Sequence, residues 1–238
     1  MTNRDADPPI IRLVHVHHTY GRLTALADLT FDIAKNEWVF ISGPSGAGKT
    51  TLLKLLYFGT RASAGEVIVD GIPLTHLPRN RVPRLRRTCG VIFQDYKLIP
   101  GRTVFENVAL VLEAAGCERR LISKKVQAVL RMVGMEGHAD ALPPRLSGGE
   151  QQRAAVARAI VGDPKIILAD EPTGSLDEES ARAVLALLQA AHIRGATVII
   201  ATHDKGMIRS IGGRVLYLNQ GRLYAAGHIK KRYDRMVL

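Results

Sequence analysis

A glycine-rich stretch at residues 43–51 reads GPSGAGKTT, and its residue types suit the binding of phosphate. Glycine has no Cβ, so successive backbone N–H groups in such a loop can turn towards one anion. Lys49 and Thr50 open a predicted helix, whose N-terminal dipole favours negative charge at the same place. In this pattern the lysine contacts the β- and γ-phosphates of a nucleotide and the threonine hydroxyl binds Mg²⁺. An ordinary glycine turn would not need the lysine, so we predict a nucleotide site.

Two acids, Asp170 and Glu171, end a short apolar run that begins at residue 165. Such a run is typical of a buried parallel strand, and ligands of open α/β sheets gather at the carboxyl ends of the strands. We expect Asp170 to coordinate Mg²⁺ and Glu171 to accept a proton from the water that attacks the γ-phosphate. A pair of surface acids is the alternative, and the apolar strand before them argues against it.

Two other polar side chains also follow apolar strand-like runs. Gln94 follows residues 89–93, and His203 follows residues 196–202. If these runs belong to the same parallel sheet, both side chains lie at its carboxyl edge with Asp170. Gln94 is then a candidate for contact with Mg²⁺ or the attacking water, and His203 is a candidate for contact with the γ-phosphate.

A second glycine-containing helix start is found at residues 146–153, which read LSGGEQQR. Ser147 is a good N-cap, and the two glycines after it expose backbone N–H groups, so this is a second helix-terminal anion site. One nucleotide does not need two such sites on the same chain. We therefore expect each chain to lend one site to its neighbour's nucleotide, in a head-to-tail pair.

The elements that must position these residues alternate between short apolar runs and helical patterns, which predicts an α/β fold. The predicted strands are residues 10–17, 27–33, 38–42, 65–69, 89–93, 165–170, 196–202, 214–219 and 222–225. The predicted helices are residues 48–56, 104–114, 123–133, 147–161 and 175–194, with a basic helix-like run at 79–87. Residues from about 95 to about 160 are expected to form a helical insertion in the α/β core.

Tyr20 is expected in a loop after the first predicted strand, upstream of the phosphate-binding stretch. There its ring could stack on a nucleobase. The alternative is a hairpin tyrosine that packs on its own sheet.

Composition gives the class of protein and the compartment that we expect. The chain has 238 residues, of which 46% are hydrophobic, and a formal charge of +11. This charge suits nucleic acid, an anionic membrane or simply solvated faces. No apolar run approaches the ~18 residues that a membrane-spanning helix needs, and the N-terminus lacks a signal-peptide pattern. We expect a cytosolic chain with no disulfide framework, whose role at a membrane would depend on a partner.

The expected domain organisation is simple. Residues 1–9 read as a disordered leader, residues 10–228 as a single nucleotide-binding domain with its helical subdomain at about 95–160, and residues 229–238 as a basic C-terminal tail.

The glycine-rich stretch, LSGGEQQR, ILADEP and the Thr202-His203-Asp204 triplet occur together, and their combination resembles the ATP-binding cassette (ABC) family over nearly the whole chain. The resemblance implies a P-loop NTPase (RecA-like) core with an antiparallel β subdomain and an inserted α-helical subdomain. It also implies ATP and Mg²⁺ as cofactors, and an ATP-dependent head-to-tail homodimer that hydrolysis reopens.

The resemblance further implies a role for each matching residue. Tyr20 would stack on adenine; Glu171, His203 and Gln94 would be catalytic; and Thr50, Gln94 and Asp170 would hold the metal. The phosphate contacts in the glycine-rich stretch would be Gly43, Ser45, Gly46, Gly48, Lys49, Thr50 and Thr51. The contacts made across the dimer would be Ser147, Gly148, Gly149 and the D-loop acid Asp177.

Within this family the chain resembles the ATPases of bacterial cell division. The matching residues are 80–83, 85–87, 90–95, 102–104 and 107–109, in a region where family members engage a membrane subunit. The resemblance implies that ATP-driven closure acts on that subunit and activates peptidoglycan hydrolases outside the membrane. Three alternatives remain: the ATPase of a lipoprotein-release or export transporter, a nucleic-acid-associated cassette, for which the long insertions and the second cassette are missing, and a division scaffold.

Overall fold

The computed structural model describes residues 7–229, which divide into two compact units. The first unit contains residues 7–85 and 197–229, and the second contains residues 86–196. The predicted leader and tail lie mostly outside the described residues. Ile229, which was expected to begin the tail, is the last residue of a strand.

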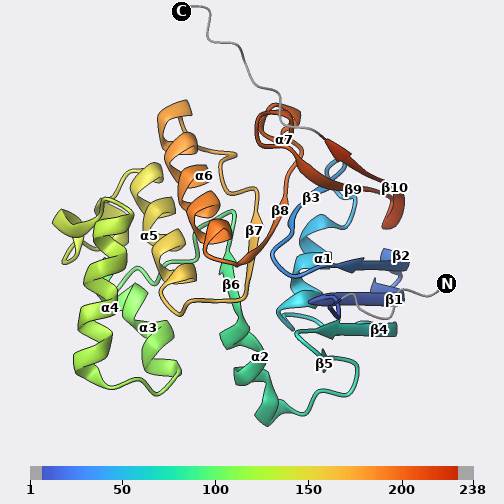
Figure 1. Cartoon of the computed structure of the whole chain (residues 1–238), viewed down its shortest axis with the longest axis horizontal. Coiled ribbons are helices and arrows are strands. Elements are labelled where there is room, and N and C mark those ends of the chain that lie inside the picture. Colours follow the sequence, from blue (N-terminus) through green and yellow to red (C-terminus); the bar gives the residue numbers. More distant parts are fainter. Residues whose placement is uncertain (1–6, 230–238) are drawn as a thin grey trace, which may run out of the picture. The chain divides into compact units, whose positions relative to one another are not determined.

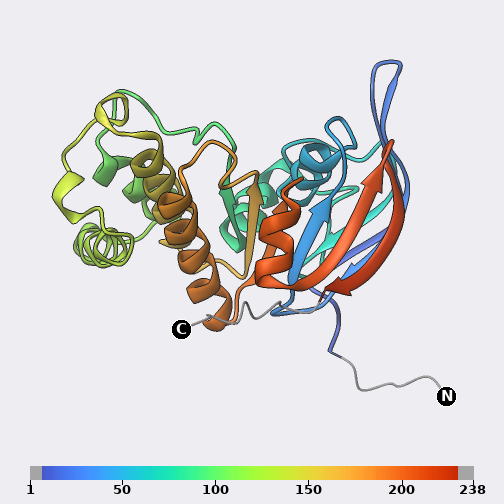
Figure 2. The same cartoon turned by 90° about the horizontal axis from the view of Figure 1, so that it is seen from above.

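An antiparallel sheet in the first unit joins β1 (Ile11–Tyr20), β2 (Leu23–Ile33), β4 (Ala64–Val69) and β5 (Ile72–Pro73) in the order β2-β1-β4-β5. Along the start of β1, Ile11 and Leu13 are buried while Arg12 between them is exposed, which is the period-two pattern of a sheet with one buried face. This sheet is the expected antiparallel β subdomain. In Figure 2 the hairpin of β1 and β2, drawn in blue, extends beyond the other strands of this unit.

Parallel strands form the other sheet of the first unit. The strand β3 (Trp38–Ser42) pairs in parallel with β8 (Thr197–Ala201) on one side and with β9 (Gly213–Asn219) on the other. Every residue of β3 and β8 is buried, as their unbroken apolar sequences predicted. A hairpin joins β9 to the antiparallel β10 (Arg222–Ile229), and the curved pair is clear in Figure 2.

Two helices of the first unit follow strands of this sheet. The helix α1 (Lys49–Leu56) confirms the predicted helix and buries four leucines: Leu52, Leu53, Leu55 and Leu56. The helix α7 (Lys205–Ile211) was not predicted; Asp204 caps it by accepting hydrogen bonds from the N–H groups of Gly206 and Met207.

The basic run at residues 79–87 forms the 3₁₀-helix Arg79–Arg81 and then α2 (Val82–Thr88), which contains the boundary between the units. All five of its arginines are exposed, and Leu85 is its buried residue.

The second unit pairs the strand β6 (Cys89–Ile92) in parallel with β7 (Ile166–Asp170) and contains a group of helices. Three of them lie in the predicted helical insertion: α3 (Val104–Ala114), α4 (Arg119–Met132) and α5 (Gly148–Ile160). The fourth, α6 (Glu178–Ile193), packs against α5 (Figure 1). Short 3₁₀-helices, Glu136–His138 and Pro143–Arg145, connect α4 to α5. The helix α4 begins four residues earlier than predicted, after an N-cap at Glu118.

Within residues 7–229, no helix is both long enough and apolar enough to cross a membrane. Cys89 is buried and Cys117 is half-buried, and neither forms a disulfide among the described residues.

Candidate functional site

The glycine-rich loop of the first unit connects β3 to α1, as predicted. Gly43, Gly46 and Gly48 have φ angles of 149°, 76° and 99°, a region that other residues rarely adopt. A Cβ on Gly43 would lie only 2.1 Å from the carbonyl oxygen of Leu218 in β9. The loop can therefore keep this backbone only with glycine at these positions.

The N-terminus of α1 has no side-chain cap within the described part of the chain, in contrast to the N-termini of α3, α5 and α6. Gly48 occupies the N-cap position, and the first turn contains no acidic residue. Ser45, Gly46 and Thr50 are exposed beside it, whereas Thr51 is half-buried. The N–H groups and the dipole of α1 can therefore act on an anion without competition from a side chain.

Lys49 lies over this loop with its ammonium group turned back on the backbone. Its Nζ donates hydrogen bonds to the carbonyl oxygens of Gly43 at 2.9 Å and Pro44 at 3.1 Å, and the residue is 8% exposed. An ammonium group has three donors, so two are satisfied by the loop. The charge is thus held next to the place where the sequence predicts phosphate.

Two further predicted residues also belong to the first unit. Tyr20 is the last residue of β1 and not part of a loop, because the pairing with β2 continues to Leu23; this corrects the sequence prediction. Its ring lies edge-on to His18 at 4.5 Å between centroids and remains 44% exposed, so it packs on its own sheet and still offers a free face. His203 is exposed and follows β8 by two residues.

In the second unit, the parallel pairing of β6 and β7 brings Gln94 and the two acids to the same sheet edge. Ile92 pairs with Ala169; Asp170 follows directly on β7, and Gln94 follows Ile92 after one intervening residue. Gln94 is exposed, and Asp170 and Glu171 are half-buried. Of the predicted gathering of Gln94, His203 and Asp170 at the carboxyl end of parallel strands, the part that involves Gln94 and Asp170 is therefore confirmed.

Glu171 has a φ of 44°, although it is not glycine and precedes Pro172. Its carbonyl oxygen accepts a hydrogen bond from the N–H of Gly174 at 3.2 Å, which closes a turn. The carbonyl oxygen of Pro172 accepts a hydrogen bond from Nε2 of Gln152 at 2.8 Å. The segment that carries the predicted catalytic carboxylate is thus tied to α5.

The segment after Gln94 is also tied to α5. The guanidinium group of Arg158 donates to the carbonyl oxygens of Tyr96 at 2.7 Å and Lys97 at 2.6 Å, both of which have positive φ angles. Burial lowers the pKa of Arg158 from its usual value. In addition, the hydroxyl of Tyr96 lies 3.1 Å from that of Ser175, beyond the acids.

The N-terminus of α5 is closed by its own side chains. The N–H and Oγ of Ser147 both donate to Oε2 of Glu150 at 2.8 Å, and the N–H of Glu150 donates back to Oγ of Ser147 at 3.3 Å. This is a capping box, and its hydrogen bonds from Ser147 hold the pKa of Glu150 below the usual value. Nε2 of His138 lies 3.2 Å from the other carboxylate oxygen.

The two glycines after Ser147 lie next to other candidate residues of this unit. A Cβ on Gly149 would lie 2.5 Å from Oγ of Ser180, so the start of α5 adjoins the start of α6. Asp177 caps α6 by accepting from the N–H of Ser180 at 2.9 Å, and these hydrogen bonds lower its pKa. Asp177, the predicted D-loop acid, thus lies close to the LSGGEQQR stretch and caps a helix.

Three residues of α5 were missed by the sequence analysis: Glu150, Gln152 and Arg158. The Ser-x-x-Glu spacing is a known capping signal that could have indicated Glu150. Gln152 and Arg158 are polar residues in an alanine-rich helix, and this contrast was the available signal for them.

The described residues offer few side-chain ligands for a metal ion. Within residues 7–229, no group of three His, Cys, Asp or Glu side chains is arranged to hold a metal ion. Mg²⁺ in nucleotide sites needs only one or two protein oxygen ligands besides phosphates and water. Gln94 and Asp170 of the second unit offer an amide oxygen and a carboxylate of this kind, and Thr50 of the first unit offers a hydroxyl, so each side chain fits the chemistry of Mg²⁺ brought by a nucleotide.

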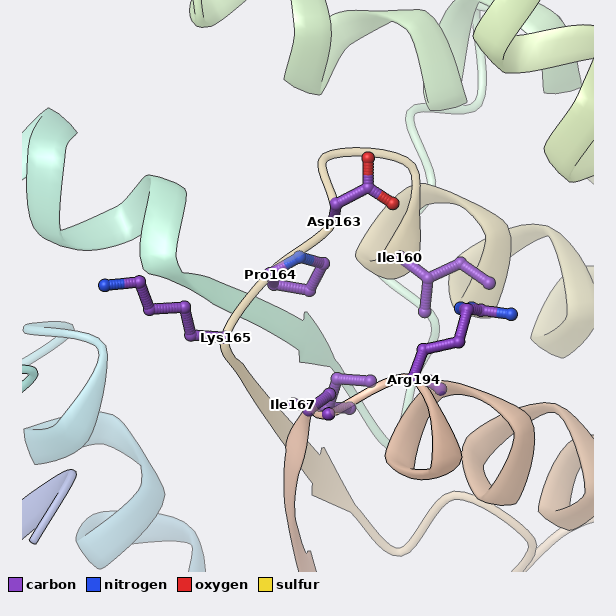
Figure 3. A pocket seen from close by; sticks show the side chains of 9 residues that line it. Ile160, Asp163, Pro164, Lys165, Ile167 and Arg194 are labelled. Carbon is purple, nitrogen blue, oxygen red and sulfur yellow. The ribbon is translucent and has the colours of Figure 1, made fainter. Parts of the chain in front are cut away.

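A cavity of about 340 Å³ in the second unit has walls that include Ile160, Ile167 and Arg194 (Figure 3). It lies at the amino-terminal end of β7, and the ammonium end of Lys165 points away from Ile160 and Arg194. Asp170 is at the other end of this strand, roughly 16 Å away at ~3.3 Å per residue. We therefore do not assign the candidate chemistry to this cavity.

Comparisons with known proteins agree with this arrangement. A family model described as "ABC transporter" matches residues 26–174. The chain is 44% identical over 221 residues to the cell division ATP-binding protein FtsE of Escherichia coli K12, covering 92% of this chain and 100% of that protein. It is 44% identical over 216 residues to FtsE of Mycobacterium tuberculosis, covering 90% and 94%.

A solved structure of the ATP-binding cassette MJ0796, a dimer in a post-hydrolysis state bound to ADP and Pi, matches with a TM-score of 0.86 and 34% identity. The match covers 93% of this chain and 100% of that one. The expected P-loop NTPase fold is thereby confirmed. The chain belongs to the ABC transporter family, as an ATPase subunit similar to FtsE.

Proposed function

We propose that this ABC ATPase works in bacterial cell division, where it uses ATP to act on a membrane subunit of the FtsX type. The observation that supports this most strongly is the 44% identity to a cell division ATP-binding protein along its entire length. At the membrane, closure of the ATPase would be transmitted through that subunit to peptidoglycan hydrolases at the septum. The chain itself would lie on the cytoplasmic face of the inner membrane, held there by its partner.

The loop geometry of the first unit supports the nucleotide contacts that we propose. The N–H groups of residues 43–51 and the N-terminus of α1 would bind the triphosphate, with Tyr20 against the adenine ring. Lys49 would exchange its contacts with the carbonyls of Gly43 and Pro44 for phosphate oxygens, which form stronger, charge-assisted hydrogen bonds. Bound Mg²⁺ would neutralise charge on the phosphates, and Thr50, Gln94 and Asp170 would hold it.

Hydrolysis needs a base for the attacking water, and Glu171 is our candidate. Its carboxylate follows β7 directly and is half-buried, which suits a group that must accept a proton and still be reached by water. His203 would contact the γ-phosphate and stabilise the negative charge on it as it separates from ADP.

We further propose a head-to-tail dimer closed by ATP, supported by the dimeric solved cassettes. Ser147, Gly148 and Gly149 of one chain would contact the nucleotide bound by the other. Asp177 would lie beside that contact, since the starts of α5 and α6 adjoin.

The enzymatic part of the proposal is tested by purified Glu171→Gln protein. We expect turnover to fall by about 10²-fold or more, the range for a lost general base, while ATP binding and an ATP-dependent dimer persist. Lys49→Ala is the companion variant, and it should lose nucleotide binding and hence the dimer. Wild-type turnover in Glu171→Gln would show that another group is the base.

The biological part is tested by purifying tagged Glu171→Gln protein from solubilised membranes of its host, with Lys49→Ala as the matched control. Recovery of an FtsX-type membrane protein with Glu171→Gln, and less of it with Lys49→Ala, would support the division role. Recovery of a lipoprotein-release or export permease would instead assign the ATPase to a transporter. One similar solved structure, that of MJ0796, is described as a bacterial ABC transporter cassette.

A further inference from the structure

A buried glutamine on α5 makes a contact that the family assignment does not explain. Gln152 is only 1% exposed, and its Nε2 donates to the carbonyl oxygen of Pro172 at 2.8 Å. Its Oε1 is also buried and has no hydrogen-bond partner among residues 7–229. A buried amide with one unsatisfied atom is costly, so packing alone would favour an apolar residue at this position.

The backbone that Gln152 holds is unusual. Glu171 lies immediately before Pro172 and has a φ of 44°. A residue before proline is normally pushed towards extended conformations, and a left-handed φ is uncommon for any residue except glycine. Strain of this kind persists only where the surrounding structure imposes it. Among the described contacts, β7 fixes the segment on one side, and the bond from Gln152 fixes it on the other.

The position of Gln152 along α5 connects this backbone to the start of the helix. It lies five residues after Ser147, which is about 1.4 turns. The helix is continuous over this distance, so a displacement of its first turn displaces the amide of Gln152 as well. The carbonyl of Pro172 would follow, and with it the orientation of the Glu171 carboxylate.

We propose that Gln152 is a positioning residue for Glu171, and that it links occupancy of the N-terminus of α5 to the orientation of the catalytic carboxylate in the same chain. This inference rests on the proposed function, because it takes Glu171 to be the base. If Gln152 were purely structural, its loss would lower the stability of the fold without lowering kcat selectively relative to ATP binding.

The test is Gln152→Met, which keeps the length of the side chain and removes the donor. We expect kcat for ATP hydrolysis to fall by on the order of 10- to 100-fold, the loss associated with small misplacement of a catalytic group. The KM for ATP should stay within about twofold, because an interaction that matters only at the transition state lowers kcat.

The neighbouring glutamine provides a matched control. Nε2 of Gln151 also donates to a backbone carbonyl, that of Leu146 at 3.1 Å, but this acceptor lies just before α5 in the chain and not next to Glu171. Gln151→Met should leave kcat within about twofold of wild type, since it leaves the Pro172 contact intact. An equal loss of kcat in both variants would overturn the proposal, because it would indicate a general effect on α5.

A double-mutant cycle separates positioning from stability. Single-turnover rates are compared for wild type, Gln152→Met, Glu171→Gln and the double variant. If Gln152 acts through Glu171, adding Gln152→Met to Glu171→Gln should change the residual rate by less than about twofold. Fully additive losses would mean that Gln152 does not act through the carboxylate, and the proposal would fail.

Two precautions keep the result interpretable. If Gln152→Met does not fold, as judged by its melting temperature, Gln152→Asn replaces it; its amide is one methylene too short for the same contact, and kcat should again fall selectively. If Glu171→Gln alone keeps wild-type turnover, the proposed base is wrong. If Glu171→Gln is inactive but Gln152→Met and Gln152→Asn have normal kcat, the positioning role alone is wrong.

Discussion

The two glycine-rich helix starts of this chain, before α1 and before α5, look alike in sequence but differ in structure. At α1 the described residues provide no side-chain cap, the first turn has no acid, and a lysine lies over the loop. At α5 a serine and a glutamate satisfy each other and place a carboxylate in the first turn. The α1 terminus is therefore open to an anion, whereas the α5 terminus must first exchange an internal contact.

The difference continues along the two helices. The buried residues of α1 beyond Lys49 are leucines, while α5 buries Gln152 and uses Arg158 to hold backbone carbonyls of another segment. A helix with apolar contacts positions a ligand site and little else. A helix with polar contacts to two loops also transmits its own position to them. We infer that α1 is a binding element and α5 a coupling element.

The largest expected difference in the free energy of unfolding is between alanine substitutions at the two glycine-rich helix starts. Gly43→Ala should cost about 4 kcal/mol or more in the free energy of unfolding, because its Cβ would overlap the carbonyl of Leu218. Gly148→Ala should be tolerated, since the nearest atom to its Cβ is the movable hydroxyl of Tyr96 at 3.1 Å. Urea unfolding of both variants makes the comparison; similar losses would contradict it.

The next effect concerns the polar contacts of α5. Arg158→Met removes two charge-assisted hydrogen bonds to carbonyls, and we expect a loss of about 3 kcal/mol in the free energy of unfolding. Lys54→Met is the equivalent change in the last turn of α1 and should cost less than about 1 kcal/mol, the value of a charge near a helix C-terminus. Chemical denaturation of both variants will show whether α5 really depends on its polar contacts more than α1 does.

A smaller effect is expected from the serines. Ser147→Ala should lower the free energy of unfolding by about 1 kcal/mol through loss of the N-cap. Ser45→Ala should change it by less than about 0.5 kcal/mol, because Ser45 is exposed in the loop before α1. Thermal melting of the two variants checks this, and a stability cost at Ser45 as large as that at Ser147 would argue against an uncapped α1.

The smallest effect is a dependence on pH that the α5 terminus should show and the α1 terminus should not. The hydrogen bonds from Ser147 lower the pKa of Glu150, and His138 and Arg153 act in the same direction. A lowered folded-state pKa gives stability that is present above the ordinary carboxyl pKa and is lost as the pH falls through the lowered value. Glu150→Gln keeps the capping pattern but not the charge, so its stability should fall less than that of wild type between about pH 5 and about pH 3. Parallel acid titrations of unfolding would detect this, and identical curves would exclude a role for the charge.

The elements of this fold were predictable where the sequence pattern is local. The strand β3, the helices α1 and α3 and the turn before β10 follow from apolar periodicity and glycine positions, and the structure confirms them. Tyr20 was misplaced because the length of β1 depends on its pairing with Leu23, which a single-strand pattern does not contain. The helix α7 was missed because it is short and has a glycine in its first turn; its Asp204 cap was the one local indication.

The candidate residues were also predictable from the sequence, but the hydrogen bonds that hold the backbone around them were not. Glycine-rich and acidic motifs identified Lys49, Asp170 and Glu171 from residue types alone. The bonds that hold the backbone near these motifs join residues far apart: Gln152 to Pro172, and Arg158 to Tyr96 and Lys97. The pairing of these residues is not apparent from the sequence, because a backbone carbonyl is the acceptor and every residue has one.

The contact of Lys49 with its own loop has a consequence for biogenesis. Its buried ammonium group already donates to the carbonyl oxygens of Gly43 and Pro44, so two of its three donors have acceptors in the folded chain before it meets a ligand. We therefore expect that Lys49 does not make folding of a newly synthesised chain depend on nucleotide. The supply of ATP would then regulate what the protein does, and not how much of it folds.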